Sequence, residues 1–465
     1  MFVGRQRELA QLETLYAEGQ AALFILYGRR RVGKTELLRH FCRDKPGLFF
    51  VATMVSDAEQ LAEFSRTVWR ATHPDVPPGF TFPSWESAFQ ALADLPDRPV
   101  VVLDEFTYLM SGNRSIPSIL QKVWDEKLNG RPLLLVLCGS YIGMMETEVL
   151  GYHAPLYGRR AGNLLLRPLE LNDGPAFFPR YAPARQLEAW AVLGGMPYYL
   201  SLFDDARDLF ANIRRRVLDP QGILYHEPRL LLMEELREPR NYFSLLRAIA
   251  HGRTRLGEID QAAGLGNSHT TARYLDILQQ MRYVRREVPV TESRPEKSKK
   301  GLYRITDPFL RFWFRYVHSH GAALEMGLGD AILEQEVRPS FDGYVAGAYE
   351  DAARFHVARL AGTGRLPFRP DRIGGWWDRA AEIDVLAISD RERRVLAGEC
   401  KWSARPVGIN ILEELKDKTR SLVSQNPGLR VDYALFSKSG FTPALRAAAT
   451  ADGILLATVE EMMGD

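Results

Sequence analysis

The chain has 465 residues and a net charge of +2, because 60 basic residues nearly balance 58 acidic ones. Hydrophobic residues make up 46% of it and charged residues 25%, which is typical of a globular protein and excludes a disordered or fibrous chain. Any surface for nucleic acid must therefore be a local patch. We expect a cytoplasmic protein with no membrane partner, since we find no signal peptide, no apolar run of about 20 residues and no disulfide spacing.

In chain order, the predicted elements indicate an α/β protein of four domains. Residues 1–170 alternate short apolar runs with amphipathic stretches, which predicts a parallel sheet covered by helices on both faces, as in a P-loop NTPase. We expect a helical lid at 171–235, a winged helix-turn-helix at 236–320 and a second α/β domain at 321–465. The strands expected in the first domain are residues 21–27, 48–52, 99–103, 133–138 and 164–169.

A glycine-rich octapeptide follows the first predicted strand and leads into a helical stretch. It has the pattern GxxxxGK(S/T) in the strand–loop–helix context that this pattern requires. In such a loop, backbone N–H groups surround the phosphates of ATP, Lys34 contacts the outer phosphates and the Thr35 hydroxyl holds Mg²⁺. The residues expected to bind the nucleotide here are Gly28, Arg29, Arg30, Arg31, Val32, Gly33, Lys34, Thr35 and Glu36.

Two carboxylates, Asp104 and Glu105, follow the apolar run 100–103. At this position Asp104 is expected to orient Mg²⁺ and Glu105 to polarise the attacking water, which distinguishes an ATPase from a small-molecule kinase. Strand-end carboxylates are often only solvated, but the phosphate loop in the same chain favours the hydrolytic interpretation. The spacing of the two motifs fits a sheet in which an inserted strand separates them.

Ser140, Arg159 and Arg160 are further candidates for the nucleotide site. Ser140 ends an apolar run and either contacts the γ-phosphate or the water, as a sensor residue does, or forms a strand-end turn. Arg159 and Arg160 follow Gly158 and either supply positive charge to the transition state or lie on a solvated surface turn. If one of these arginines acts on a neighbouring copy, the protein must be a homo-oligomer.

Several of these motifs resemble those of the archaeal-type ATPases, relatives of the STAND class among the AAA-like P-loop proteins. The resemblance covers the first two predicted domains and implies that residues 2–9 form the family's N-terminal box near the adenine. It also implies that the Gly-Gly-x-Pro segment is a lid motif, with Pro197 close to the base or ribose. The matching segments are residues 2–9, 27–38, 104–105, 156–162 and 194–199.

Residues 240–305 have the order of elements of a winged helix. Helices are expected at 242–250 and 256–263, and a third, capped by Asn267 or Ser268, runs to about Met281 before two strands that flank a polar loop. The third helix starts with short polar side chains and Arg273, which suit base edges or phosphates in a major groove of DNA. We therefore expect contact with DNA or RNA, but winged helices also act as spacers or protein contacts.

The predicted hairpin of this domain carries a local excess of positive charge, with eight basic residues against three acidic ones. Such an excess would make nucleic-acid binding sensitive to salt. The basic residues are Arg282, Arg285, Arg286, Arg294, Lys297, Lys299, Lys300 and Arg304, and the acidic ones are Glu287, Glu292 and Glu296.

The C-terminal α/β region carries a second set of charged candidates. The segments that contain Asp384 and Glu399 are expected to be adjacent strands, on which residues two apart share a face. Glu399 and Lys401 would therefore point together, with Asp384 opposite them. Two carboxylates and an ammonium can hold Mg²⁺ and polarise a water for attack on a phosphodiester. Glu350, on a preceding helix, adds a further carboxylate.

This arrangement resembles the D…ExK motif of the PD-(D/E)xK nuclease superfamily. The resemblance implies a restriction-endonuclease-like fold in which Asp384, Glu399 and Lys401 are catalytic. The proline of the family's motif is absent, since Ile383 precedes Asp384, and the other interpretation is a nuclease fold that has lost cleavage. The metal ligands expected in the whole chain are Thr35, Asp104, Glu350, Asp384 and Glu399.

Two functions follow from these expectations. The first is an ATP-hydrolysing, DNA-associated protein in which the nucleotide state governs a winged helix and a nuclease-like domain. The second is a STAND-like regulatory switch, in which ATP binding drives assembly or transcriptional control and the C-terminal domain only binds DNA. Glu105 favours the first, because a pure switch does not need a residue that activates water.

Overall fold

The computed structural model describes residues 2–73, 75–236 and 238–464. The chain divides into two compact units. The N-terminal unit is Met1–Leu169 with Met196–Tyr198, and the C-terminal unit is Glu170–Gly195 with Tyr199–Asp465. Within the described ranges, no helix combines the length and the apolar character needed to cross a membrane.

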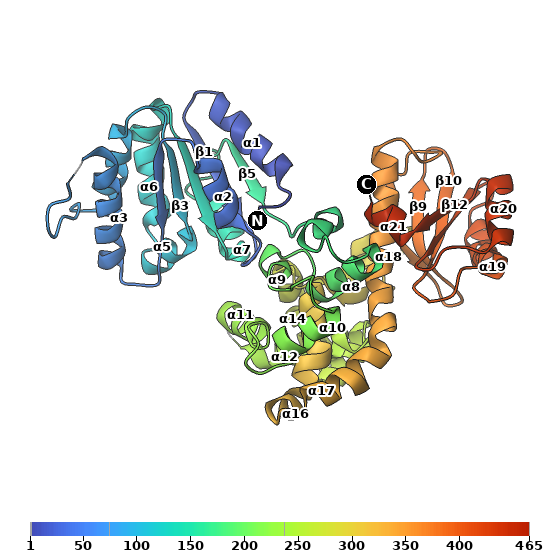
Figure 1. Cartoon of the computed structure of the whole chain (residues 1–465). Coiled ribbons are helices and arrows are strands. Elements are labelled where there is room, and N and C mark those ends of the chain that lie inside the picture. The colour runs from blue at the N-terminus through green and yellow to red at the C-terminus, as the bar shows by residue number, and fades with distance from the viewer. Residues whose placement is uncertain (1, 74, 237, 465) are drawn as a thin grey trace. The chain divides into compact units, whose positions relative to one another are not determined.

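A five-stranded parallel sheet forms the centre of the N-terminal unit (Figure 1). Its strands are β1 (Ala22–Tyr27), β2 (Gly47–Val51), β3 (Val100–Asp104), β4 (Leu134–Gly139) and β5 (Gly162–Leu165). They lie in the order β2-β3-β4-β1-β5, so β4 separates β1 from β3. The inserted strand that was predicted between the phosphate loop and the carboxylate pair is therefore confirmed.

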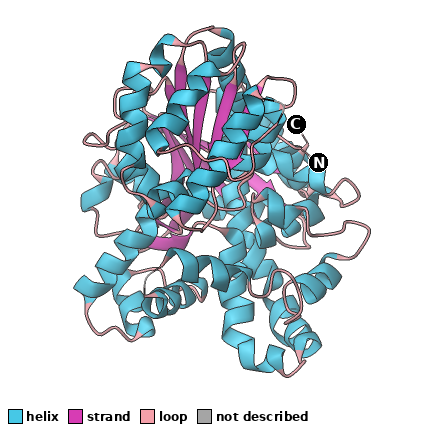
Figure 2. Cartoon of the chain, turned by 90° about the vertical axis from the view of Figure 1, so that its left-hand side faces the viewer, coloured by secondary structure: helices cyan, strands magenta, loops and turns pink. Residues whose placement is uncertain are grey.

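Helices cover both faces of this sheet. They are α1 (Gln6–Ala17), α2 (Lys34–Cys42), α3 (Asp57–Thr72), α4 (Trp85–Gln90), α5 (Phe106–Gly112), α6 (Ile116–Glu126) and α7 (Ile142–Met144). In Figure 1, α3, α5 and α6 lie on one face and α1 and α2 on the other, and Figure 2 shows the strands enclosed by helices. Because both faces are covered, β1 and β4 are buried at every position.

The strand boundaries follow the apolar runs of the sequence, and β5 differs most from its prediction. It ends at Leu165, four residues before the predicted end. The N–H of Leu166 still donates to the carbonyl oxygen of Tyr27 at 2.7 Å. The strand does not continue because Pro168 has no N–H group with which to extend the ladder.

The C-terminal unit begins with helices and a hairpin, in the order that the sequence predicts. The helices are α8 (Pro183–Leu193), α9 (Pro197–Leu200), which starts in the other unit, α10 (Leu209–Arg216), α11 (Glu227–Glu235), α12 (Pro239–Ala250), α13 (Leu256–Ala263) and α14 (Ser268–Gln280). The side chain of Asn267 caps α14 by accepting from the N–H of His269 at 2.9 Å. An antiparallel hairpin of β6 (Val284–Glu287) and β7 (Leu302–Ile305) follows.

After the hairpin, the chain forms further helices that lead to the C-terminal sheet. α15 (Pro308–Phe312) continues into the π-helical turn Trp313–Val317. The aromatic residues of this segment are buried, with Phe309, Phe312 and Phe314 fully enclosed. The helices beyond it are α16 (Gly321–Glu325), α17 (Gly329–Ile332), α18 (Arg338–Gly362), α19 (Ile409–Gln425), α20 (Pro443–Asp452) and α21 (Val459–Met463).

A mixed five-stranded sheet completes the C-terminal unit. Its strands are β8 (Arg372–Trp377), β9 (Glu382–Ser389), β10 (Arg394–Lys401), β11 (Arg430–Ser437) and β12 (Leu455–Thr458), in the order β12-β11-β10-β9-β8. β10 pairs antiparallel with β9 and parallel with β11. β8 was not predicted, because two glycines and a bulge between Gly374 and Trp376 interrupt its alternating pattern.

Candidate functional site

The phosphate loop connects the end of β1 to the start of α2. Gly28 has a φ of 155°, and a Cβ at this position would lie 2.5 Å from the carbonyl oxygen of Leu166. Gly33, which precedes α2, has a φ of 95°. Both positions require glycine, because a side chain would clash or be strained. The loop thus leads directly to the positive end of α2, where anions bind favourably.

Lys34 is 5% exposed and folds back over the loop. Its Nζ donates to the carbonyl oxygens of Gly28 and Arg29 at 2.9 and 3.1 Å. It also donates to Oγ of Ser140 at 2.9 Å, at the end of β4. The ammonium therefore lies where the loop and the central strand meet. Of the remaining predicted loop residues, Val32 is buried and Glu36 is exposed.

Asp104 and Glu105 meet Thr35 and Ser140 at the end of β3. Oγ1 of Thr35 donates to Oδ2 of Asp104 at 2.6 Å, and the N–H of Glu105 donates to Oδ1 at 2.9 Å. Glu105 has a φ of 51°, a left-handed conformation that is uncommon outside glycine. Oγ of Ser140 donates to Oε1 of Glu105 at 2.7 Å. A continuous chain of hydrogen bonds therefore joins Lys34, Ser140 and Glu105.

The oxygen atoms around this chain fit a complex of Mg²⁺ with a nucleotide. Oε2 of Glu105 is buried and has no hydrogen-bond partner in the described part of the chain. Thr35 and Asp104 offer one hydroxyl and one carboxylate, the small ligand set that Mg²⁺ takes when phosphates and water complete its shell. Residues 2–73, 75–236 and 238–464 contain no group of three or more His, Cys, Asp or Glu side chains placed to hold a metal ion.

Two segments that the sequence assigned to the nucleotide site border the phosphate loop. Nη2 of Arg5 donates to the carbonyl oxygen of Val32 at 2.9 Å. A Cβ built on Gly33 would lie 3.7 Å from Cγ of Pro197. The guanidinium of Arg31 lies 4.4 Å above the ring of Tyr198. The predicted contacts of these segments with the nucleotide stay predictions.

Arg30 joins the loop to two tyrosines that the sequence analysis missed. Its Nη2 donates to the hydroxyls of Tyr108 and Tyr141, and its guanidinium lies 5.9 and 5.4 Å from the two ring centroids. Tyr108 comes three residues after Glu105, and Tyr141 follows Ser140 directly. The sequence feature that could have identified these tyrosines is that each comes within three residues of a residue predicted for the site.

The structure places the arginine pair that follows Gly158 away from these contacts. Nε and Nη2 of Arg159 donate to both carboxylate oxygens of Asp125, each at 2.7 Å, and Nη1 of Arg160 donates to the carbonyl oxygen of Leu150 at 3.1 Å. Among the described residues, no hydrogen bond or ion pair joins either arginine to the phosphate loop. Their action on a nucleotide, in the same or a second copy, stays a prediction.

A second group of charged residues lies where β9 and β10 meet; we call Glu350, Asp384, Glu399, Lys401 and Lys418 the carboxylate–lysine cluster. Oδ2 of Asp384 accepts from the N–H of Cys400 at 2.8 Å. Nζ of Lys401 donates to Oε1 of Glu399 at 2.9 Å. The structure thus brings Asp384 and the Glu399–Lys401 pair together across the two strands.

Lys418 on α19 is the member of this cluster that the sequence analysis missed. Its Nζ donates to Oε1 and Oε2 of Glu399 at 2.8 and 2.7 Å. Lys416, two residues earlier on the same helix, instead lies 3.8 Å from Asp452. Lys418 was recognisable in principle, because it is spaced three and four residues from the buried Leu415 and Leu422 on the inner face of α19.

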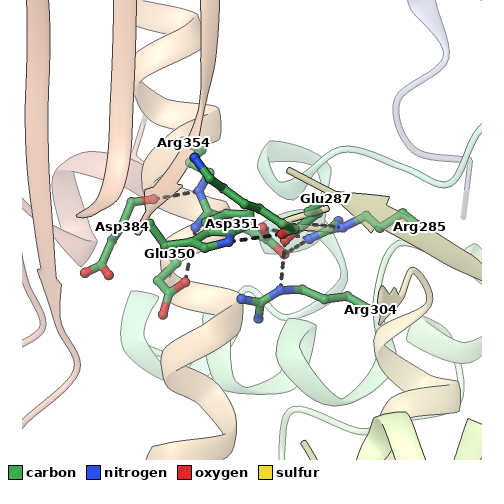
Figure 3. A network of polar contacts seen from close by, with 9 residues as sticks. Arg285, Glu287, Arg304, Glu350, Asp351, Arg354 and Asp384 are labelled. Carbon is green, nitrogen blue, oxygen red and sulfur yellow. Dashed lines mark hydrogen bonds and ion pairs between the residues drawn. The ribbon is translucent and has the colours of Figure 1, made fainter. Parts of the chain in front are cut away.

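Burial shifts the two remaining carboxyl groups of the cluster toward their neutral forms. It raises the pKa of Glu350 to about 7, with a further increase from Asp384 and a decrease from Arg354. Burial and the charge of Glu399 raise the pKa of Asp384 to about 6, against the effect of the Cys400 N–H. Figure 3 shows the carboxyl groups of Glu350 and Asp384 next to each other.

Arg354 connects this cluster to the polar network drawn in Figure 3. Its Nε donates to the carbonyl oxygen of Asp384 at 2.8 Å, and its Nη2 donates to Glu350 at 3.2 Å. Its Nη1 donates to Asp351 at 2.9 Å. One arginine therefore holds a strand and two consecutive acidic residues of α18 in place.

Comparison with known families matches two segments of the chain. Residues 2–203 match an ATPase domain predominantly from Archaea, and residues 313–417 match archaeal and bacterial proteins of unknown function. An uncharacterized protein of Methanocaldococcus jannaschii is 32% identical over 402 residues, which cover 86% of this chain and 88% of that protein. The chain belongs to the archaeal-type ATPase family.

Two further proteins are similar to parts of this chain. An uncharacterized ATP-binding protein of Methanocaldococcus jannaschii is 56% identical over 45 residues, which are 10% of this chain and 76% of that protein. Among solved structures, a Walker-type ATPase of Pyrococcus abyssi has a TM-score of 0.52 at 24% identity and covers 68% of this chain and 96% of that chain. At this identity the likeness shows the fold alone, which is that of a P-loop NTPase.

In this archaeal-type ATPase, the loop of the β6–β7 hairpin packs against β8. The N–H of Val290 donates to the carbonyl oxygen of Gly375 at 2.9 Å, and the carbonyl oxygen of Val290 accepts from Nη1 of Arg372 at 3.0 Å. The indole N–H of Trp377 donates to the carbonyl oxygen of Lys300 at 3.2 Å. The polar loop predicted to be the wing is therefore held at Val290 and Lys300 by the C-terminal sheet, and residues 293–297 between them are exposed.

Several of the eight basic residues of this hairpin form ion pairs or hydrogen bonds with other residues of the same chain. Arg285 forms ion pairs with Glu287 at 2.6 Å and with Asp351 at 3.0 Å. Arg304 forms a second ion pair with Glu287, at 2.8 Å. The positive charge that this hairpin offers to nucleic acid is thus smaller than the sequence count indicated. Two more of its basic side chains bond within the hairpin: Arg286 and Lys300.

The first turns of α14 still present polar side chains to solvent. His269, Thr270 and Arg273 are exposed. Thr271 is buried and donates from Oγ1 to Asp260 at 2.6 Å, so its role is structural. The candidate nucleic-acid contacts of this helix are therefore reduced to its exposed residues.

Proposed function

We propose that this protein binds ATP with Mg²⁺ at the phosphate loop and hydrolyses it to ADP and phosphate. The observation that carries the proposal is the chain of hydrogen bonds from Lys34 through Ser140 to Glu105. It places a cation, a neutral donor and a carboxylate in contact. Positioning and charge stabilisation by such groups are what hydrolysis of a nucleoside triphosphate requires. Membership of the archaeal-type ATPase family supports the same function.

In the proposed reaction, the oxygen of a water attacks the γ-phosphorus while the bond to the β–γ bridging oxygen breaks. Glu105 orients that water through Oε2 and takes its proton, while Ser140 holds Oε1. Lys34 stabilises the negative charge that develops on the phosphate oxygens. ADP then leaves with the electron pair of the broken bond.

Thr35 and Asp104 are the residues that would hold Mg²⁺. When bound, the ion neutralises charge on the β- and γ-phosphate oxygens. The 2.6 Å hydrogen bond between the two side chains already keeps their oxygen atoms together. We therefore expect Asp104→Ala to weaken the Mg²⁺ dependence of nucleotide binding.

The test of this proposal is the release of phosphate from ATP by the full chain, with Mg²⁺ and with the metal chelated. Lys34→Ala should abolish turnover, because the ammonium that contacts the phosphates is removed. Arg39→Ala, on the same helix, is a matched control that should leave turnover unchanged. Equal turnover by Lys34→Ala and the wild type would overturn the proposal.

We also propose that the C-terminal unit binds nucleic acid, chiefly DNA, and that Asp384, Glu399 and Lys401 form a metal-dependent site for phosphodiester cleavage on a nuclease-like fold. The 2.9 Å contact of Lys401 with Glu399 and the place of Asp384 beside them support this proposal. Nicking of DNA with Mg²⁺ or Mn²⁺ tests it. Asp384→Ala and Lys401→Ala should each abolish the activity. Unchanged nicking by these variants would show that the two residues are not catalytic.

A regulatory switch with an inactive nuclease-like fold is the alternative. It is favoured by Lys418, which occupies both oxygen atoms of Glu399, so that a metal could bind Glu399 only after this ion pair opens. ATP-dependent assembly without cleavage would support the switch.

With either function, we propose the domain bounds 1–170, 171–235, 236–320 and 321–465 and a cytoplasmic location. We also propose a homo-oligomer if Arg159 or Arg160 acts on a second copy.

A further inference from the structure

A cavity of about 550 Å³ lies within the C-terminal unit, and none of the described residues that line it belongs to the two groups above. Its walls come from α11, α12, the π-helical turn Trp313–Val317 and α16. We call it the aromatic–arginine pocket. Its defining residues are Arg229, Arg240, Phe243, Arg247, Trp313 and His318.

Aromatic rings form one wall of this pocket. The rings of Trp313 and His318 stack at a centroid distance of 5.4 Å, and Phe243 lies edge-on to them at 6.3 and 5.6 Å. The indole N–H of Trp313 donates to the carbonyl oxygen of Tyr225 at 2.6 Å, which fixes the orientation of the ring. The wall is therefore a rigid surface suited to the ring of a ligand.

Three exposed arginines, Arg229, Arg240 and Arg247, line the same pocket. Within the described ranges, no carboxylate lies within 4.0 Å of their guanidinium groups. Glu325 is an acidic residue of the lining, and its Oε1 accepts from the hydroxyl of Tyr225 at 3.0 Å. The described lining therefore holds three guanidinium groups against one carboxylate, which leaves an excess of positive charge.

We propose that the aromatic–arginine pocket binds a mononucleotide, separately from the ATP at the phosphate loop. The base would pack against Phe243 and His318, since ring stacking is the favourable contact such a wall offers. The phosphate would meet the arginines, whose planar guanidinium groups form paired, charge-assisted hydrogen bonds with it.

The size of the pocket favours a single nucleotide over a nucleic-acid strand. Its volume of about 550 Å³ lies within the range of roughly 300 to 1,000 Å³ that is typical of small-ligand sites. A strand would need a groove that continues past the first base, with cations along its length. A mononucleotide can contact both the aromatic wall and the arginines. Inorganic phosphate can contact only the arginines, and a nucleoside only the aromatic wall.

The test uses the full chain with the substitution Lys34→Ala, which removes nucleotide binding at the phosphate loop. AMP and GMP are the probes, and calorimetry measures their affinity and stoichiometry. We expect one site per chain, with weaker binding of adenosine and of inorganic phosphate. The double substitution Arg240→Ala and Arg247→Ala should lower the affinity at least about tenfold, because charge-assisted hydrogen bonds are lost.

Arg253→Ala is the matched control, since Arg253 is an exposed arginine of the same region that does not line the pocket. It should leave the affinity unchanged. Arg240 and Arg247 are exposed, so their replacement should not affect folding, which thermal unfolding checks. Absence of saturable binding of either probe, or an unchanged affinity in the double variant, would overturn the proposal. So would tight binding of a single-stranded oligonucleotide that the same double substitution weakens while AMP and GMP fail to bind.

Discussion

The hydroxyl of Ser140 donates a hydrogen bond of 2.7 Å to Oε1 of Glu105, and the same hydroxyl accepts one from Lys34 at 2.9 Å. Ser140 thus links the carboxylate proposed to orient water with the ammonium proposed to contact the phosphates. The link exists because β4 lies between β1 and β3 in the sheet. The residue at the end of the central strand can therefore reach both neighbours.

Replacing Ser140 should impair hydrolysis more than binding. In Ser140→Ala, Oε1 of Glu105 loses its donor, so the carboxylate no longer has a fixed orientation. We expect kcat to fall roughly tenfold with little change in KM, since a hydrogen bond to a charged group contributes about 1.5 kcal/mol. Ser140→Thr keeps the hydroxyl and should retain most of the activity. Steady-state kinetics that show equal kcat in Ser140→Ala and the wild type would contradict this role.

Arg30 should act as a positioning residue for the same site. It donates to the hydroxyls of Tyr108, three residues after Glu105, and of Tyr141, directly after Ser140. Arg30→Lys keeps the charge but cannot contact both hydroxyls with one planar group. We expect both Arg30→Lys and Arg30→Ala to lower kcat by about tenfold. Recovery of full activity in Arg30→Lys would show that only the charge matters.

The carboxyl group of Glu350 should make the stability of the C-terminal unit depend on pH. Its pKa is raised to about 7 by burial and by Asp384, whereas an unfolded glutamate has a pKa of about 4.3. Between these values the folded state binds more protons, so the free energy of unfolding falls as pH rises. From about pH 5 to about pH 8, the wild type should lose on the order of 2 kcal/mol relative to Glu350→Gln, which cannot ionise.

Chemical unfolding of the two proteins at both pH values checks this expectation. Arg354 lowers the pKa of Glu350, and Arg354→Ala should enlarge the pH effect. An identical pH dependence of the wild type and Glu350→Gln would show that Glu350 is ionised throughout this range.

Lys418 should stabilise the C-terminal unit through Glu399, which is 5% exposed. Lys418→Met removes a donor to both carboxylate oxygens and leaves Lys401 as the remaining partner in the cluster. We expect a loss of about 2 kcal/mol, less than the 3–5 kcal/mol typical for a buried charge left without any partner. Lys416→Met, two residues away, is the matched control and should cost less than about 0.5 kcal/mol. Equal stability of the two variants would contradict this role.

The nucleotide site could be predicted from the sequence because its parts are local motifs on strand ends. Thr35, Asp104 and Glu105 follow or precede recognisable apolar runs, and parallel strands place such residues at one edge of the sheet. The spacing of two of these motifs also predicted that one strand lies between the strands that carry them. The contacts of Arg30 did not follow, because they depend on the orientation of two tyrosine side chains after the strands end.

The environment of the hairpin could not be predicted in the same way. A count of charges treats Arg285 and Arg304 as exposed, but Asp351, which pairs with Arg285, lies 66 residues further along the chain. β8 was hidden by its glycines, and with it the surface that holds the loop at Val290. Contacts between distant segments determine whether a cation is available, and the local pattern does not contain them.

The most direct test of the central claim is the release of phosphate in a single turnover by the wild type and Glu105→Gln, with ATP binding measured on the same preparations. If Glu105 orients the attacking water, both proteins bind Mg²⁺-ATP with similar affinity and release by Glu105→Gln is at least about 100-fold slower. Equal rates of phosphate release in the two proteins would contradict the account.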